Sequence, residues 1–388
     1  HFLRDDFPHD AILGLGEFAA EHWNPKLKEE GLSLTRYKFE NYIAELWYRS
    51  DTKMALLSGA PFDDPTWWLL GNDQIVAARD MINDFAGTTR MLGHSVITPK
   101  QDGWMDEAER AMAELKPNSW KSYTIGDPLS PSKYPWRLDD EKVMYPFYEK
   151  SLKAGINTIC IHKGLLPPDY ETSFKGVWKY ATVDDVPKAA KDWPEMNFVI
   201  YHAALRPFLE LPDQAWKEFE ESGGYIKWAS DLARIPQEHG VSNVYAELGS
   251  TFANSAVAHP RFCAAFIGTL VGGMGADHVV WGSDTVWYGS PQWQIEAMRR
   301  LEVPEDMQKK YKLPALGGAN SLTKQAIFGL NSARIYGLSM NEATNMPDLP
   351  NFSEDKIAGL AAKFREAGGG PSNKRFGYCL LYTSPSPR

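Results

Sequence analysis

Short, almost wholly apolar runs recur along this chain and alternate with segments that have helical patterns. Seven such runs are strand candidates, and their starts lie 29 to 46 residues apart. They cover residues 53–60, 90–98, 119–125, 157–162, 197–202, 243–248 and 278–282. Runs without polar alternation are typical of strands buried on both faces, and strands that alternate with helices indicate parallel pairing through crossovers. The pattern therefore predicts an α/β fold built from βα units.

Two parallel folds compete for this pattern. Seven βα units that begin in mid-pattern favour a (β/α)8 TIM barrel whose first strand is missing or truncated at the N-terminus. The alternative is a doubly wound open sheet, which usually carries a glycine-rich phosphate turn after its first strand. No G-x-G-x-x-G or G-x-x-x-x-G-K-[ST] pattern follows any candidate strand. We therefore expect the barrel and not a dinucleotide-dependent dehydrogenase.

The chain divides into three expected segments. Residues 1–340 form the barrel, residues 341–378 form a C-terminal helical extension, and residues 379–388 resemble a translated sequencing adapter. The alternative for the last segment is a disordered tail rich in Ser and Pro. A cytoplasmic location is expected. Because the chain starts at His1 and not at Met, an upstream export signal is the alternative.

Composition excludes several classes of protein. The 388 residues include 41 basic and 50 acidic side chains, and a formal charge of −9 argues against a nucleic-acid partner. No apolar run is long enough to span a membrane. Three cysteines cannot form a disulfide framework. The remaining expectation is a globular protein with a small-molecule substrate and a possible homo-oligomeric state.

Polar residues that end the strands are the candidate site. His162 and His202 each end a candidate strand, Asp284 follows a third, and His1 is placed where the missing strand would end. In a barrel these ends converge on one face. A lone histidine at a strand end is more often structural, and only the combination of two histidines with an aspartate indicates a site. Neutral imidazole and carboxylate together suit zinc or a similar divalent cation.

Several longer motifs resemble those of the metal-dependent amidohydrolase superfamily. The stretch HVVWGSDTVWYGSP resembles its eighth-strand signature, and AIFGLNSARIYGL (326–338) is similar to its terminal helix. NTICIHKG and NFVIYHAAL match the patterns of strands five and six. The resemblance is narrower to the branch that contains aminocarboxymuconate-semialdehyde decarboxylase and related hydrolases. It covers residues 1–338.

The resemblance implies a site with one divalent metal ion, zinc or alternatively manganese. His162 and Asp284 would be metal ligands, and His202 would handle protons together with Asp284. The family has a His-x-His pair on its first strand, of which only His1 is present, so His1 is carried over as a third ligand. Lys121 occupies a strand-four position at which other branches of the superfamily have a carboxylated lysine that bridges two metals. Here we expect Lys121 to face the substrate.

Three further residues are expected to bind substrate. Lys163 and Arg206 stand just past two of the strand-end histidines and would suit a substrate carboxylate, with solvated loop charges as the alternative. Trp287 would wall an aromatic or cyclic substrate, with simple loop packing as the alternative. Glu247 also lies on a candidate strand, without an assigned role.

The expected function is hydrolysis by a metal-dependent amidohydrolase. A metal-activated water would attack an amide, lactone or similar bond in a small acidic substrate. Non-oxidative decarboxylation on the same site is the first alternative, and a catalytically inactive binding barrel is the second.

Overall fold

The computed structural model describes residues 1–206, 212–339, 349 and 351–369. Its centre is a sheet of seven strands whose spatial order is their order in the sequence. Each strand lies inside one of the seven predicted runs and pairs in parallel with the next along the chain. The strands are β1 (Ala55–Leu57), β2 (Met91–Val96), β3 (Ser119–Tyr123), β4 (Thr158–His162), β5 (Asn197–Tyr201), β6 (Val244–Glu247) and β7 (Val279–Val280).

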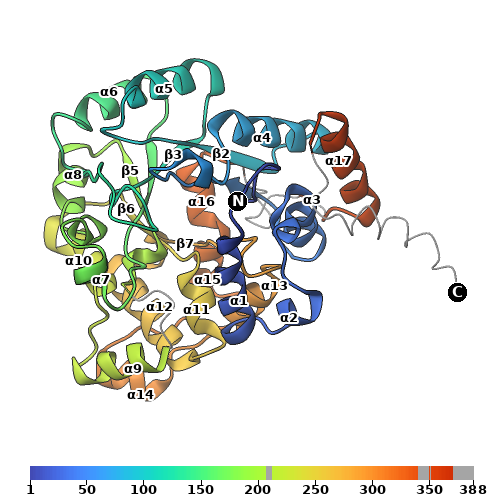
Figure 1. Ribbon diagram of the computed structural model, residues 1–388. Helices are drawn as coiled ribbons and strands as arrows, with labels where there is room; N and C mark the ends of the chain where they lie inside the picture. The colour runs from blue at the N-terminus through green and yellow to red at the C-terminus, as the bar shows by residue number, and fades with distance from the viewer. Residues whose placement is uncertain (207–211, 340–348, 350, 370–388) are drawn as a thin grey trace, which may run out of the picture.

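The sheet curls around a central space, and helices cover its outer face (Figure 1). Within the described residues no ladder joins β1 to β7, so one seam of the barrel is open. The arrangement confirms the predicted α/β barrel fold, and the described residues contribute seven parallel strands to it. Five strands are buried along their whole length, which explains their lack of polar alternation: β2, β3, β4, β6 and β7.

Helices fill the connections between the strands and cover both ends of the chain. They are α1 (Leu13–His22), α2 (Lys26–Glu30), α3 (Phe39–Ile43), α4 (Asn72–Ala86), α5 (Trp104–Arg110), α6 (Tyr145–Lys153), α7 (Tyr170–Ser173), α8 (Val186–Asp192), α9 (Pro212–Glu221), α10 (Ala229–His239), α11 (Thr251–Ala256), α12 (Pro260–Met274), α13 (Gln292–Arg300), α14 (Glu305–Tyr311), α15 (Leu322–Gln325), α16 (Asn331–Ile335) and α17 (Glu354–Glu366). Pro236 lies inside α10 and removes one backbone donor from this helix.

Alternate strand residues face the inside of the barrel. Cys160, Val199, Tyr245 and Val280 pack together there with Ile335 from α16. Because side chains alternate along a strand, residues two positions further on share the same inner face. This register turns the ends of β4, β5 and β6 towards one central space.

The N-terminal segment lies against the loop that follows β7. The terminal amine of His1 donates to the carbonyl oxygen of Thr285 (2.9 Å). Asn24 Nδ2 donates to the carbonyl oxygen of Tyr288 (2.9 Å). These contacts join the two ends of the barrel segment at the carboxyl face of the sheet.

The C-terminal extension contains the expected helix, α17, which begins after Ser353. The Ser353 hydroxyl accepts from the backbone N–H of Lys356, and this N-cap stabilises the first turn. Phe364 stacks on Phe39 of α3 with ring centroids 4.1 Å apart. The extension therefore packs on the N-terminal helices, while residues 379–388 lie outside the described part of the chain.

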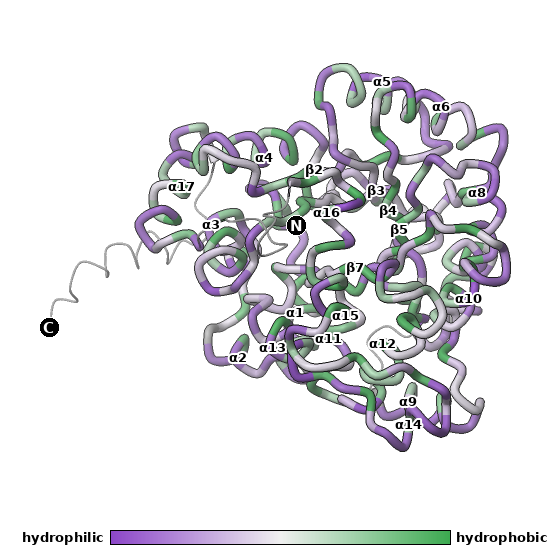
Figure 2. The backbone as a smooth tube through the Cα atoms, turned by 180° about the vertical axis from the view of Figure 1, so that it is seen from behind, coloured by the Kyte–Doolittle hydropathy of each residue, from purple (hydrophilic) through white to green (hydrophobic). Residues whose placement is uncertain are grey.

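Hydropathy follows this architecture. Hydrophobic segments gather in the central strands, and hydrophilic segments lie in outer helices such as α5 and α6 (Figure 2). None of the helices in the described ranges is both long and apolar enough to cross a membrane.

Candidate active site

The carboxyl ends of β4, β5 and β7 bring His162, His202 and Asp284 together. The ring centroids of His162 and His202 are 4.5 Å apart, and the electrostatic influence of Asp284 reaches both rings. The backbone at two of these ends is strained. His202 has φ 63° and Asp284 has φ 51°, in the left-handed region that costs a non-glycine residue roughly 1–2 kcal/mol. Such strain concentrates at functional sites.

His1 completes the group from the other end of the chain. Its Nε2 lies 2.7 Å from Oδ1 of Asp284. Burial alone would raise the pKa of Asp284, but His1, His202 and Ser250 together outweigh burial and hold that pKa well below its usual range. Asp284 is therefore an ionised carboxylate at neutral pH.

Trp287 supports His1 and does not wall the cavity. Its indole N–H donates to Nε2 of His1 (2.8 Å), and its side chain is nearly buried. The ring also packs against Tyr37, with centroids 5.3 Å apart. The expectation that Trp287 contacts substrate does not fit this placement, because a loop aromatic can turn inwards to pack.

A hydroxyl chain holds the second oxygen of Asp284. The Ser250 hydroxyl donates to Oδ2, and the Tyr288 hydroxyl lies 2.6 Å from the Ser250 oxygen. Since the Ser250 proton points at the carboxylate, Tyr288 donates to Ser250. Ser250 was not expected from the sequence, because it belongs to no strand-end pattern of metal or proton chemistry.

His202 is held as one tautomer. Its Nδ1 lies 2.6 Å from the carbonyl oxygen of Gly249, so Nδ1 carries the hydrogen and donates. Burial lowers the pKa of His202 to about 4, so the ring is neutral near pH 7. The Nε2 atom is then an unprotonated acceptor, as a general base requires.

Glu247 stands beside His202. Its carboxylate accepts from the backbone N–H of His202 (3.2 Å) and from that of Gly249 (2.8 Å). Burial, reinforced by the charge of Asp284, raises the pKa of Glu247. The sequence placed Glu247 on a candidate strand, and this position was a signal of its role.

His162 and Lys121 are both buried with unsatisfied nitrogen atoms. His162 stacks on Tyr123, with ring centroids 4.2 Å apart, and its Nδ1 has no hydrogen-bond partner among the described residues. The Lys121 amine lies 3.8 Å from the centre of the Tyr201 ring, also without a hydrogen-bond partner there. Burial lowers the pKa of Lys121. Both side chains point into the barrel interior.

Lys163 and Arg206 do not face the site, contrary to expectation. Lys163 is fully buried, and its amine lies 2.8 Å from Oδ1 of Asp185. Arg206 is buried near the ring of Tyr170, 5.8 Å from its centroid. Lys163 directly follows a strand residue that faces inwards, so its side chain turns to the opposite side.

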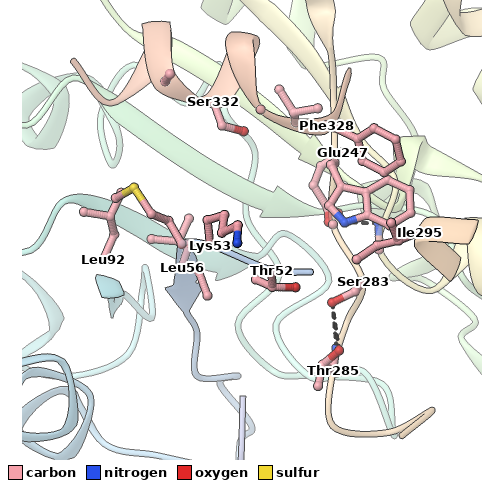
Figure 3. Close-up of a pocket in the computed structure, with 18 of the residues that line it drawn as sticks. Thr52, Lys53, Leu56, Leu92, Glu247, Ser283, Thr285, Ile295, Phe328 and Ser332 are labelled. Atoms are coloured by element: carbon pink, nitrogen blue, oxygen red, sulfur yellow. Dashed lines mark hydrogen bonds between the residues drawn. The ribbon is translucent and has the colours of Figure 1, made fainter. Parts of the chain in front are cut away.

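Three of the expected site residues line a cavity of about 480 Å³. These are His1, His202 and Asp284, and Glu247 joins them. The cavity continues towards the open seam, where Leu56 and Ile295 form part of its wall (Figure 3). Polar as well as apolar side chains line the cavity, and Thr52 and Lys53 are among the polar ones (Figure 3).

The predicted metal ligands suit a divalent cation in kind. His1, His162 and Asp284 offer two imidazoles and a carboxylate, the donors that zinc and manganese accept. In the described part of the chain, however, no three His, Cys, Asp or Glu side chains are grouped as a ready metal site. His1 and Asp284 touch each other directly, so these two side chains must separate to admit an ion.

Comparison with known proteins places the chain in a family. A family model described as Amidohydrolase matches residues 67–338, well over half of the chain. A search of curated protein sequences gave no match. The matched segment contains β2 to β7 and, among the candidate site residues, all except His1.

Solved structures share the fold at low identity. An uncharacterised TIM-barrel protein from Bordetella bronchiseptica is 13% identical, with a TM-score of 0.52, over 85% of this chain and 90% of that one. A 2,6-dihydroxybenzoate decarboxylase from Rhizobium is 12% identical, with a TM-score of 0.45, over 87% and 97% of the two chains. A manganese-bound 5-carboxyvanillate decarboxylase from Novosphingobium aromaticivorans is 16% identical, with a TM-score of 0.45, over 86% and 90%. The first likeness supports the barrel fold, and the other two are too distant to add to it. By the family match, the chain belongs to the amidohydrolase family and is an enzyme of that family.

Proposed function

We propose that the protein is a metal-dependent hydrolase that cleaves an amide, lactone or similar bond in a small acidic substrate. The observation that carries this proposal is the state of His202. Its Nδ1–H bond to Gly249 and its low pKa leave Nε2 as a free base at the wall of the cavity, near the ionised Asp284. A positioned base of this kind accepts a proton from the attacking water.

We further propose that His1, His162 and Asp284 hold one divalent cation, zinc or manganese. When bound, such an ion acts as a Lewis acid on the reacting oxygen. Asp284 would remain ionised because Ser250 donates to its second oxygen. His202 would take the proton at Nε2 and return it to the leaving group, and its neutral state at pH 7 suits that exchange.

The acidic character of the substrate rests on Lys121. Its buried amine has no hydrogen-bond partner among the described residues, so a carboxylate that entered the barrel would find an unused donor. The same feature favours a second candidate function, the non-oxidative decarboxylation of a carboxylate substrate. Hydrolysis is preferred because the site supplies a base for water.

Metal content and turnover together test the proposal. Purified protein should contain about one zinc or manganese per chain by elemental analysis, and Asp284→Asn should lose it. The matched control is Asp277→Asn, which changes an exposed acid before β7 at the opposite end of the barrel. His202→Gln should keep the metal and lose turnover on a panel of acidic amides and lactones.

The outcomes separate the candidate functions. Release of carbon dioxide without a hydrolytic product would replace hydrolysis by decarboxylation. Metal-free protein with no turnover on either panel would refute both candidates and leave a binding barrel.

A further inference from the structure

The Glu247 carboxylate occupies a slot between β6 and the loop after β7. The side chain is buried, and both of its oxygens accept backbone N–H groups: Oε1 from Gly249 and Oε2 from His202. A carboxylate that accepts two backbone donors is firmly oriented, because charge-assisted hydrogen bonds are stronger than neutral ones. Glu247 therefore links the end of β5 to the loop after β6.

The slot exists because Gly282 has no side chain. A Cβ placed on Gly282 would lie 1.4 Å from Oε1 of Glu247, which is a full overlap. A Cβ on Gly249 would lie 2.6 Å from the same oxygen. Neither glycine has a positive φ, so neither is required by its own backbone conformation. Space for the Glu247 carboxylate is the steric requirement that both positions share.

The chain at His202 needs such support. His202, Ala203 and Ala204 follow one another with φ of 63°, 47° and 52°. This left-handed region is unfavourable for non-glycine residues, because Cβ approaches the following carbonyl oxygen too closely. A run of three persists only where the surrounding structure holds it. The bond from the His202 N–H to Glu247 acts on the first residue of the run.

One carboxylate thus holds both partners of the bond that selects the His202 tautomer. It binds the backbone of His202, which carries the donor ring, and the N–H of Gly249, whose carbonyl oxygen is the acceptor. If that carbonyl moved, Nδ1 would lose its acceptor, and the hydrogen could shift to Nε2.

We propose that Glu247 is a positioning residue that fixes the tautomer of His202 and keeps Nε2 open towards the cavity. The residue touches neither substrate nor metal in this role and acts through His202. The significance for catalysis rests on the proposed function, whereas the tautomer itself can be measured without a substrate.

The test uses long-range proton–nitrogen NMR on the full chain labelled with ¹⁵N-histidine. The spectrum of His202→Gln identifies the signals of His202 by their absence. The unsubstituted protein should show His202 as a single tautomer with hydrogen on Nδ1. In Glu247→Gln the side-chain NH₂ opposes one of the two backbone N–H groups, so the signals should shift to a mixture of tautomers.

A second variant disturbs the Glu247 carboxylate without changing Glu247 itself. Gly282→Ala leaves Glu247 unchanged but removes its space, so it should give the same mixture of tautomers. Gly14→Ala is the matched control, since no atom lies within 4 Å of a Cβ at this position. The control spectrum should equal that of the unsubstituted protein. Thermal unfolding of each variant identifies any that does not fold. Glu247→Asp is then measured in place of that variant, and we expect a smaller shift towards the mixture of tautomers.

Kinetics supply an independent measurement. Loss of positioning should lower kcat about ten- to hundredfold with KM almost unchanged, as is typical when a residue behind a functional group is removed. Retention of the pure Nδ1–H tautomer in folded Glu247→Gln and Gly282→Ala would overturn the proposal. If the tautomer shifts as expected while the unsubstituted protein has no metal and no turnover, the positioning role stands and only the proposed function fails.

Discussion

Replacement of Lys163 by Met should destabilise the fold and should not act through substrate binding. The Lys163 amine and the Asp185 carboxylate are 2.8 Å apart, with 0% and 3% of their side chains exposed. The amine also donates to Thr124 Oγ1 (3.2 Å) and to the carbonyl oxygen of Tyr180 (3.0 Å). This geometry ties the end of β4 to β3 and to the following loop.

The expected magnitude follows from what the substitution leaves behind. In Lys163→Met, the buried Asp185 loses its cationic partner and retains the backbone N–H of Leu138 as a donor to Oδ2 (2.9 Å). Removal of one partner from a buried ion pair typically costs about 3–5 kcal/mol, because the other charge stays buried without compensation. Removal of both partners should cost less, so Lys163→Met with Asp185→Leu should recover part of the loss.

Equilibrium denaturation followed by tryptophan fluorescence measures these differences. The control is Lys175→Met, an exposed lysine whose replacement should change the free energy of unfolding by no more than about 0.5 kcal/mol. A loss below about 1 kcal/mol in Lys163→Met, combined with a raised KM for an acidic substrate, would refute this reasoning. It would show that the amine faces the substrate after all.

Three further predictions concern pH, the support of Asp284 and the C-terminal helix. The unfolded chain keeps Lys121 protonated up to about pH 10.5, whereas burial makes the folded chain release this proton at lower pH. The free energy of unfolding should therefore increase with pH towards 10.5, and by more than in Lys121→Met. Denaturation at several pH values measures this, and equal slopes in the two proteins would contradict it. Ser250→Ala should free the second oxygen of Asp284 and weaken metal binding about ten- to hundredfold in a chelator competition, and Tyr288→Phe should do less; unchanged affinity in Ser250→Ala would dismiss the support. Ser353→Ala should cost α17 about 1 kcal/mol, visible as increased protease cleavage in the extension, and cleavage at the original rate would argue against the cap.

Much of the fold follows from local sequence patterns. Each observed strand lies within a predicted apolar run, because strands covered on both faces leave no room for polar side chains. Helical periodicity likewise marks the buried faces of α4 and α12. The local pattern is weaker at α10, where Pro236 removes a backbone donor, but the helix packs against α12 and β6.

The site is only partly predictable for a related reason. The sequence places His162, His202 and Asp284 at strand ends, and a parallel barrel brings such ends to one face. It cannot tell on which side of the chain the next side chain will lie. Lys163 illustrates this limit, since its sequence position resembles that of a substrate ligand but its amine is paired with Asp185.

The sequence by itself determined the barrel type, the number of its visible strands and the face on which the chemistry gathers, because these depend on hydrophobic patterns that are local in the chain. The tertiary structure alone decided the contacts around that chemistry. His1 meets Asp284, Trp287 turns towards His1, and Glu247 fits the space left by Gly282. Such contacts join atoms from different strands and loops, and their distances are set only when the whole sheet has folded.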